Sequence, residues 1–195
     1  MLALNVNMRG KRAVVVGGGA VALRKVQTIL AAEGAVTVVS PALCPLLEAL
    51  SGSGEVDVRI GTYDSSDLDG AFLAVAATDN EQVNRQVAAD AGKRRILISV
   101  ADQPASGDCI FPATVRRGRL EIAVSTGGQC PSLAAEVKRL IEGVIGDEYA
   151  EILEQLAVER EKLLTDGNSS TYNAEVLRSH ARQLIAEHTD RKEPP

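Results

Sequence analysis

The chain has 195 residues, a formal net charge of −5 and 45% hydrophobic residues, values typical of a protein that buries a sizeable core. The acidic balance argues against nonspecific nucleic-acid binding, and no apolar run reaches the roughly 18 residues of a membrane span. Three widely spaced cysteines are too few for a disulfide framework, and the start lacks an apolar leader with a cleavage site. We therefore expect a cytoplasmic protein with neither nucleic acid nor membrane as a partner.

Short apolar runs alternate with helical patterns over the first half of the chain, which predicts βαβ units, a mainly parallel sheet and an α/β fold. The expected strands cover residues 12–16, 36–39, 56–60, 71–76 and 96–100. The expected helices run from Ala22 to a stop at Gly34, over 41–50 and over 80–92.

The pattern changes after Ala101. Residues 113–115 and 120–124 flank a turn and predict an antiparallel hairpin. An amphipathic helix ending near Gly146 is expected from five apolar positions, namely Leu133, Val137, Leu140, Ile141 and Val144. Two charged helical stretches follow, at about 147–164 and 173–188, separated by a polar linker at 165–171.

A glycine-rich turn joins the first strand to the first helix in the pattern G-x-G-x-x-A. Gly17 would permit the tight turn, Gly19 would let a pyrophosphate approach the backbone, and Ala22 would keep the helix close to the sheet. Such a turn also occurs as a plain strand-to-helix corner, but its context favours dinucleotide binding. The expected cofactor-binding residues of this loop, whose helix amides would face the phosphates, are Gly17, Gly18, Gly19, Ala20 and Val21.

The end of the second strand reads Val39-Ser40-Pro41, where an acidic residue usually holds the adenosine ribose. We expect Ser40, with the neighbouring Pro41 and Ala42, to take that role. No arginine follows directly to receive a 2′-phosphate, so the sequence favours NAD over NADP.

Four segments together resemble the precorrin-2 dehydrogenase family, which includes the amino-terminal module of bacterial siroheme synthase. They are GGGAVALRK at 17–25, TVVSP at 37–41, AATDNEQVN at 76–84 and the more specific block VADQPASGDCIFPATVRRGRLEIAVSTGGQCPSLA at 100–134. The resemblance runs from about Met8 to Leu164. It implies NAD-dependent oxidation of precorrin-2, a tetrapyrrole, to sirohydrochlorin, on the way to siroheme or cobalamin. Thr78, in the third segment, is a further expected cofactor contact.

The resemblance also implies an organisation into domains. We expect an NAD-binding Rossmann domain at 1–112, a central hairpin-plus-helix region at 113–146 that pairs two subunits into a homodimer, and a small helical domain at 147–195.

In this family an aspartate in the loop after the fifth strand is the principal catalytic residue, and its match here is Asp102. The carboxyl ends of parallel strands face the cofactor crevice, which supports that position independently. A carboxylate there could take a proton as a hydride leaves the substrate, so Asp102 is the candidate general base. Without the resemblance, an Asx-turn would be the simpler interpretation of Asp102.

The tetrapyrrole carries many carboxylates, which an acidic protein must hold with local cations. The candidate substrate-binding residues are Arg116, Arg117 and Arg119 in the hairpin and Thr126, Gly127, Gly128 and Ser132 before the following helix. For the arginines a solvated turn is an equal alternative, and Ser132 could simply cap the helix. Thr126 matches a serine that lies at the active site of siroheme synthase and can be phosphorylated there.

Two other functions remain open. Some relatives also insert iron or cobalt into the product; this chain has only His180 and His188 as histidines, and no metal site of its own is expected. A noncatalytic NAD-sensing module is the second alternative.

Overall fold

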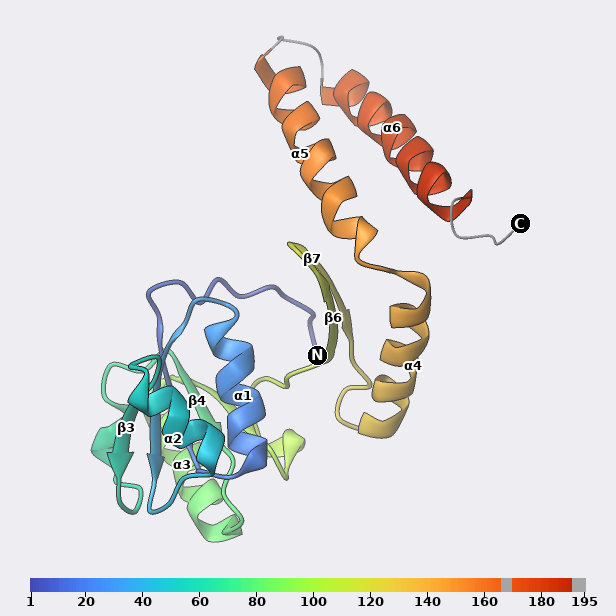
Figure 1. Ribbon diagram of the computed structural model, residues 1–195. Helices are drawn as coiled ribbons and strands as arrows, with labels where there is room; N and C mark the ends of the chain where they lie inside the picture. The colour runs from blue at the N-terminus through green and yellow to red at the C-terminus, as the bar shows by residue number, and fades with distance from the viewer. Residues whose placement is uncertain (166–169, 191–195) are drawn as a thin grey trace. The chain divides into compact units, whose positions relative to one another are not determined.

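The computed structural model describes residues 1–165 and 170–190 and divides the chain into two compact units, Met1–Phe111 and Pro112–Pro195 (Figure 1). The boundary falls one residue before the expected end of the Rossmann domain. Within the second unit, a further division at residue 146 stays a prediction, and positions 166–169 of the expected linker lie outside the described residues.

A five-stranded parallel sheet forms the first unit, in the order β3-β2-β1-β4-β5. Its strands are β1 (Arg12–Val16), β2 (Ala35–Ser40), β3 (Asp57–Ile60), β4 (Leu73–Ala76) and β5 (Leu97–Val100). Its helices are α1 (Ala20–Leu30), α2 (Pro45–Gly52) and α3 (Glu81–Arg94), with short 3-10 helices η1 (Ser65–Leu68) and η2 (Pro104–Ser106). The chain reverses direction across the sheet between β1 and β4, so the carboxyl ends of these strands flank a topological switch point.

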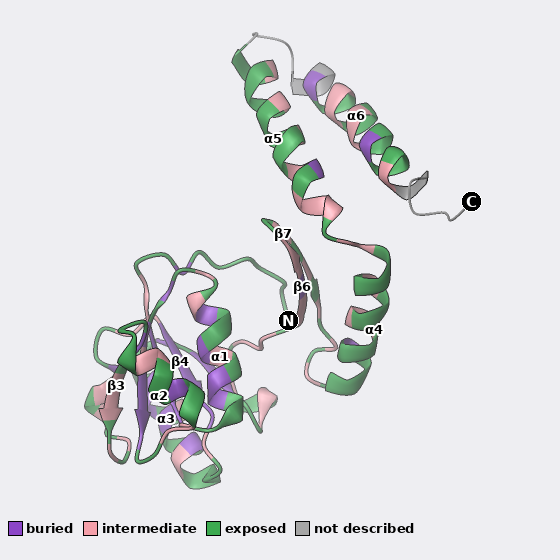
Figure 2. Cartoon of the chain, in the orientation of Figure 1, coloured by how far each residue is buried: buried purple, intermediate pink, exposed green. Residues whose placement is uncertain are grey.

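Helices cover both faces of this sheet, which explains the uninterrupted apolar runs of the strands. In β1, Ala13 and Val15 pack into a core with α1, whereas Val14 and Val16 pack into a second core with α3. Figure 2 shows the central strands buried along their length. The α/β Rossmann prediction is confirmed.

One helix boundary was wrong. The predicted helix at 41–50 begins at Pro45 instead of Pro41. Residues 41–44 form a turn that passes over the glycine loop, because the amide of Cys44 donates to the carbonyl of Gly18 at 2.8 Å. Pro45 then occupies the first helical turn, where its missing N–H costs no hydrogen bond.

The second unit contains a two-stranded antiparallel sheet and three helices. They are β6 (Ala113–Arg117), β7 (Leu120–Val124), α4 (Pro131–Val144), α5 (Glu148–Thr165) and α6 (Ser170–Asp190). Arg117 pairs with Leu120 across a two-residue turn, where Gly118 takes φ +55°. Helix α4 packs against β6, and α5 packs along α6. In this single chain Leu133, Leu140 and Val144 of α4 stay exposed, at 54%, 70% and 73%.

Candidate active site

Gly17 begins the glycine loop directly after β1. Its φ of +129° is one that side chains rarely adopt, and a Cβ there would lie 2.3 Å from the carbonyl oxygen of Ala77. The Gly17 amide also donates to the carbonyl of Val39 at 2.9 Å. The turn from β1 to α1 is therefore pressed against the ends of both neighbouring strands, and only glycine fits.

Gly18 occupies a position that the motif G-x-G-x-x-A leaves free, yet it is as restricted as Gly17. A Cβ on Gly18 would lie 1.9 Å from the carbonyl oxygen of Ala42 and 2.7 Å from the hydroxyl of Ser40. The third glycine is thus explained by the turn after β2, which crosses the loop. The run of three consecutive glycines was the sequence signal for this crossing, because none of the three residues has a side chain.

Gly19 faces open space. A Cβ at this residue would meet nothing within 4 Å among the described atoms. Gly19 is also the N-cap of α1, and the described residues provide no side-chain cap for this helix end and no acidic residue in its first turn. The first amides of α1 are left to an outside acceptor, which is the arrangement that binds a pyrophosphate.

The residues around this helix end complete a cradle that fits a dinucleotide. Ala20 and Val21 are exposed beside Gly19, whereas Ala22 is fully buried against the sheet. Lys25, further along α1, does not serve the loop. Its ammonium lies 4.4 Å from the centre of the Phe111 ring, and burial lowers its pKa.

Ser40 has a structural role. The side chain is buried, and its hydroxyl donates to the carbonyl of Ala42 at 2.7 Å, which fixes the turn over Gly18. Pro41 and Ala42 are exposed in the same turn. A contact between this turn and the adenosine ribose stays a prediction, now resting more on Pro41 and Ala42 than on the Ser40 hydroxyl.

A hydrogen-bonded group joins the carboxyl ends of β4 and β5. Thr78 follows β4, Asp102 follows β5, and the amide of Asn84 from α3 lies between them. The Asn84 Nδ2 donates to Asp102 Oδ1 at 3.1 Å and to the Thr78 carbonyl at 3.1 Å. The Asn84 Oδ1 accepts from the Thr78 amide at 3.2 Å and the Thr78 hydroxyl at 2.7 Å. Asp102 therefore lies in the loop where the candidate base was expected, at the edge of the sheet formed by the carboxyl ends of its strands.

Asn84 was missed by the sequence reasoning. It is only 1% exposed and lies on the buried face of α3 together with Val87 and Ala91. A polar residue on the apolar face of an amphipathic helix is the signal that could have found it, because a buried amide needs partners.

The hairpin arginines have three different environments. Arg116 forms an ion pair with Glu121 at 3.4 Å across the hairpin. Arg117 is largely buried, donates to the Ile145 carbonyl at 2.9 Å and pairs with Asp147 at 3.3 Å, so it ties the hairpin to the end of α4. Arg119 is exposed and has no hydrogen bond or ion pair within the part of the chain that the structure describes.

The loop before α4 carries the other substrate candidates. Gly127 and Gly128 have φ values of +64° and +84°, and the Thr126 hydroxyl accepts from the Cys130 amide at 3.1 Å. The N-cap of α4 is Cys130, so the alternative in which Ser132 caps the helix was wrong. Ser132 is an exposed residue of the first helical turn, where its hydroxyl can contact a ligand.

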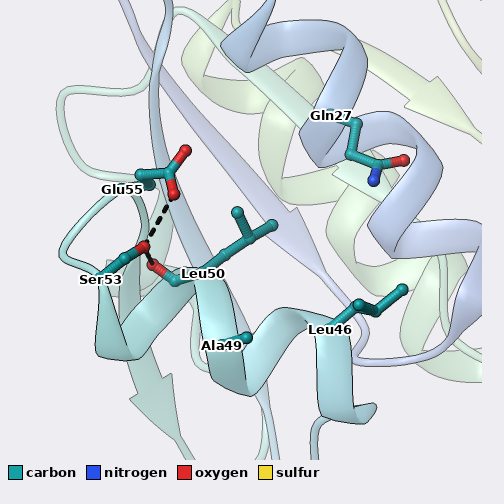
Figure 3. Close-up of a pocket in the computed structure, with 6 residues that line it drawn as sticks. All are labelled: Gln27, Leu46, Ala49, Leu50, Ser53 and Glu55. Carbon is teal, nitrogen blue, oxygen red and sulfur yellow. Dashed lines mark hydrogen bonds between the residues drawn. The ribbon is translucent and has the colours of Figure 1, made fainter.

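A shallow groove between α1 and α2 lies apart from these residues. Figure 3 shows its lining, in which Ser53 donates to Glu55 at 2.8 Å. None of the predicted site residues lines it. Among residues 1–165 and 170–190, no cluster of three His, Cys, Asp or Glu side chains suits a metal ion, and no helix is long and apolar enough to cross a membrane.

A parallel sheet with a glycine cradle at its switch point defines a dinucleotide-binding Rossmann protein. The chain belongs to the NAD(P)-binding family whose model matches residues 4–113. A second family model, described as the sirohaem biosynthesis protein central domain, matches residues 117–143. The resemblance to the precorrin-2 dehydrogenase family is thereby confirmed, as is a nicotinamide dinucleotide as cofactor.

Individual relatives agree with this family. The chain is 42% identical over 156 residues to the siroheme synthase of Pseudomonas entomophila, covering 80% of this chain and 34% of that protein. It is 43% identical over 145 residues to that of Chromobacterium violaceum, covering 74% and 31%. The chain thus spans about a third of the length of these relatives. The solved structure of SirC, a precorrin-2 dehydrogenase, superposes with a TM-score of 0.77 at 25% identity, covering 96% of this chain and 98% of that one.

Proposed function

We propose that this protein is an oxidoreductase that dehydrogenates precorrin-2 to sirohydrochlorin with NAD, in siroheme or cobalamin biosynthesis. The observation that carries the proposal is the pairing of an open phosphate cradle at Gly19 with a held carboxylate, Asp102, at the same edge of the sheet. The similarity to siroheme synthases and to SirC supports this substrate.

Residues of the first unit bind the cofactor and accept the substrate proton. The amides of Gly19, Ala20 and Val21 bind the pyrophosphate, and the N-terminus of α1 favours its negative charge. Bound NAD supplies the hydride acceptor. Asp102 accepts the proton that the substrate loses when its hydride is removed, through the carboxylate oxygen that Asn84 does not hold.

The turn after β2 supports NAD over NADP. Its residues, Ser40 to Cys44, include no basic side chain that could pair with a 2′-phosphate. The Ser40 hydroxyl is already donated to Ala42, so this turn offers the adenosine end a small, uncharged surface.

The candidates for binding the substrate carboxylates are residues of the second unit. Arg119 carries an exposed guanidinium, which suits a carboxylate ligand, and Arg116 belongs to the same hairpin, where it pairs with Glu121. Arg117 supports these two residues by holding the hairpin to α4. The remaining polar contacts are assigned to Thr126, Gly127, Gly128 and Ser132.

The exposed apolar side of α4 supports a homodimer. Leu133, Leu140 and Val144 follow helical spacing and are all more than half exposed in one chain. We assign this surface to a second copy of the chain, and the three free cysteines fit a reducing cytoplasm.

The test is an anaerobic, metal-free incubation with precorrin-2 and NAD, following sirohydrochlorin absorbance and NADH together. Product and NADH formed in equal amounts support the dehydrogenase. Ferrous or cobaltous ion is then added, and a spectral change beyond the enzyme-free control adds chelatase activity. If NAD binds and neither product forms, the proposal fails and the NAD-sensing alternative replaces it.

A further inference from the structure

We propose that Asn84 is a positioning residue for catalysis, which holds Asp102 by one carboxylate oxygen and leaves the other free to take the proton. This inference rests on the proposed role of Asp102 as the base. Asn84 touches neither substrate nor cofactor in this role; it acts through Asp102.

The orientation of the Asn84 amide is fixed by the backbone of Thr78. The Thr78 amide can only donate and the Thr78 carbonyl can only accept, so Asn84 must turn its oxygen to the first and its nitrogen to the second. With the amide reversed, its N–H groups would face the Thr78 N–H and its oxygen would face the Thr78 carbonyl, and neither pair could form a hydrogen bond. The atom that faces Asp102 is therefore an N–H donor, and the bonded Asp102 oxygen is an acceptor.

All four hydrogen-bonding positions of this amide are filled. Its oxygen accepts from the Thr78 amide and from the Thr78 hydroxyl, which lies nearer to it, at 2.7 Å, than to its other acceptor, the Asn80 carbonyl, at 3.0 Å. Its two N–H groups go to the Thr78 carbonyl and to Asp102. Because Asn84 is 1% exposed, leaving any of these positions unfilled would be costly. The amide cannot turn away from Asp102 without losing its other bonds.

The bond to Asn84 is what fixes the Asp102 carboxylate. Asp102 is exposed, and within the described residues Oδ1 has this one partner and Oδ2 has none. Among the described residues, the only other side-chain hydrogen bond from this loop to the start of α3 runs from Gln103 to Glu81, at 2.6 Å, and it does not involve the Asp102 carboxylate. Oδ1 thus sets the direction of the side chain, and Oδ2 is the oxygen available to a substrate proton.

The test compares Asn84→Ala with a matched control, Asn80→Ala. Asn80 caps the same helix through the amides of Gln82 and Val83, and its side chain does not bond Asp102. Losing a hydrogen bond to a charged group corresponds to a fall in kcat of about tenfold to a hundredfold for Asn84→Ala. The KM for precorrin-2 should change by less than about threefold, because substrate contacts are untouched. Asn80→Ala should keep kcat within about twofold.

Three results would overturn the inference: an unchanged kcat in Asn84→Ala, an equal loss in Asn80→Ala, or a loss expressed in KM alone. If Asn84→Ala does not fold, Asn84→Ser, which is too short to reach Asp102, takes its place with the same expectations. Wild-type enzyme is measured in parallel. If the wild type turns over precorrin-2 and Asn84→Ala has the same kcat, only this inference fails. If the wild type shows no turnover, the proposed function itself fails.

Discussion

Replacing Gly18 by alanine should unfold the protein at a markedly lower temperature, although Gly18 is not a motif position. The new Cβ would lie 1.9 Å from the Ala42 carbonyl oxygen, against about 3.4 Å for an ordinary contact, so this carbonyl must retreat by about 1.5 Å. That movement breaks the bond from the Ser40 hydroxyl and strains the bond from the Cys44 amide. Overpacking plus one or two lost hydrogen bonds amounts to about 3 kcal/mol, or a melting midpoint about 6–12 °C lower.

Gly19→Ala is the matched control, because its Cβ would enter space that no described atom occupies. Its stability cost is the small preference of an N-cap for glycine over alanine, about 1 kcal/mol or less. The same Cβ would obstruct the pyrophosphate, so we expect the Kd for NAD to rise by about tenfold or more.

The assay is a thermal melt of each variant together with a calorimetric titration with NAD. Gly18→Ala should lose stability, and Gly19→Ala should lose affinity. A wild-type melting midpoint in Gly18→Ala would show that the turn after β2 does not press on the loop. Wild-type affinity in Gly19→Ala would mean that the phosphate binds elsewhere.

Three further predictions concern the rest of the chain. Arg117→Ala should lower the free energy of unfolding by about 2–3 kcal/mol, because it removes the guanidinium that binds Ile145 and Asp147. Arg119→Ala should keep the wild-type melting midpoint and raise the KM for precorrin-2. Equal melting midpoints for the two variants would refute this distinction. Leu140→Glu should turn a dimer into a monomer in sedimentation at micromolar concentration, and an unchanged sedimentation coefficient would exclude this face. Burial raises the pKa of the Cys109 thiol, which lowers the fraction present as the reactive thiolate. At pH 8, iodoacetamide should therefore modify the exposed Cys130 well before Cys109, and peptide mapping can follow both reactions.

The parallel sheet could be predicted because its evidence is local. Each strand is a short apolar run, each helix a periodic pattern, and glycines or prolines mark the boundaries, so β1, β5 and the hairpin β6–β7 lie close to the predicted ranges. The start of α2 was misplaced because Pro41 and Pro45 are equally good first residues of a helix. The choice between them depends on the crossing at Gly18, a contact between segments more than twenty residues apart in sequence.

The site divides in the same way. The motif marks Gly17, where the backbone conformation and the Ala77 carbonyl leave room only for glycine, because this turn is local to the loop. At Gly19 the space is open, and its role in approaching a phosphate stays a prediction. The tasks of Asn84 and Arg117 are set by partners distant in sequence, Asp102 and Ile145, and a residue type alone does not reveal them. Ser40 bonds the carbonyl of Ala42, only two residues away, but the turn that this bond fixes lies against Gly18. Ser40 and Arg117 resemble ligand contacts in sequence, yet in the structure they hold backbone carbonyls.

The strand order separates two groups of residues that can change independently. The cradle and the turn at Ser40 follow β1 and β2, whereas Thr78, Asn84 and Asp102 belong to β4, α3 and β5, on the other side of the switch point. Among the described residues, no side-chain hydrogen bond links the Ser40 turn to the group around Asp102. Substitutions in residues 40–44 can therefore change the surface offered to a dinucleotide without touching the hydrogen bonds that hold Asp102.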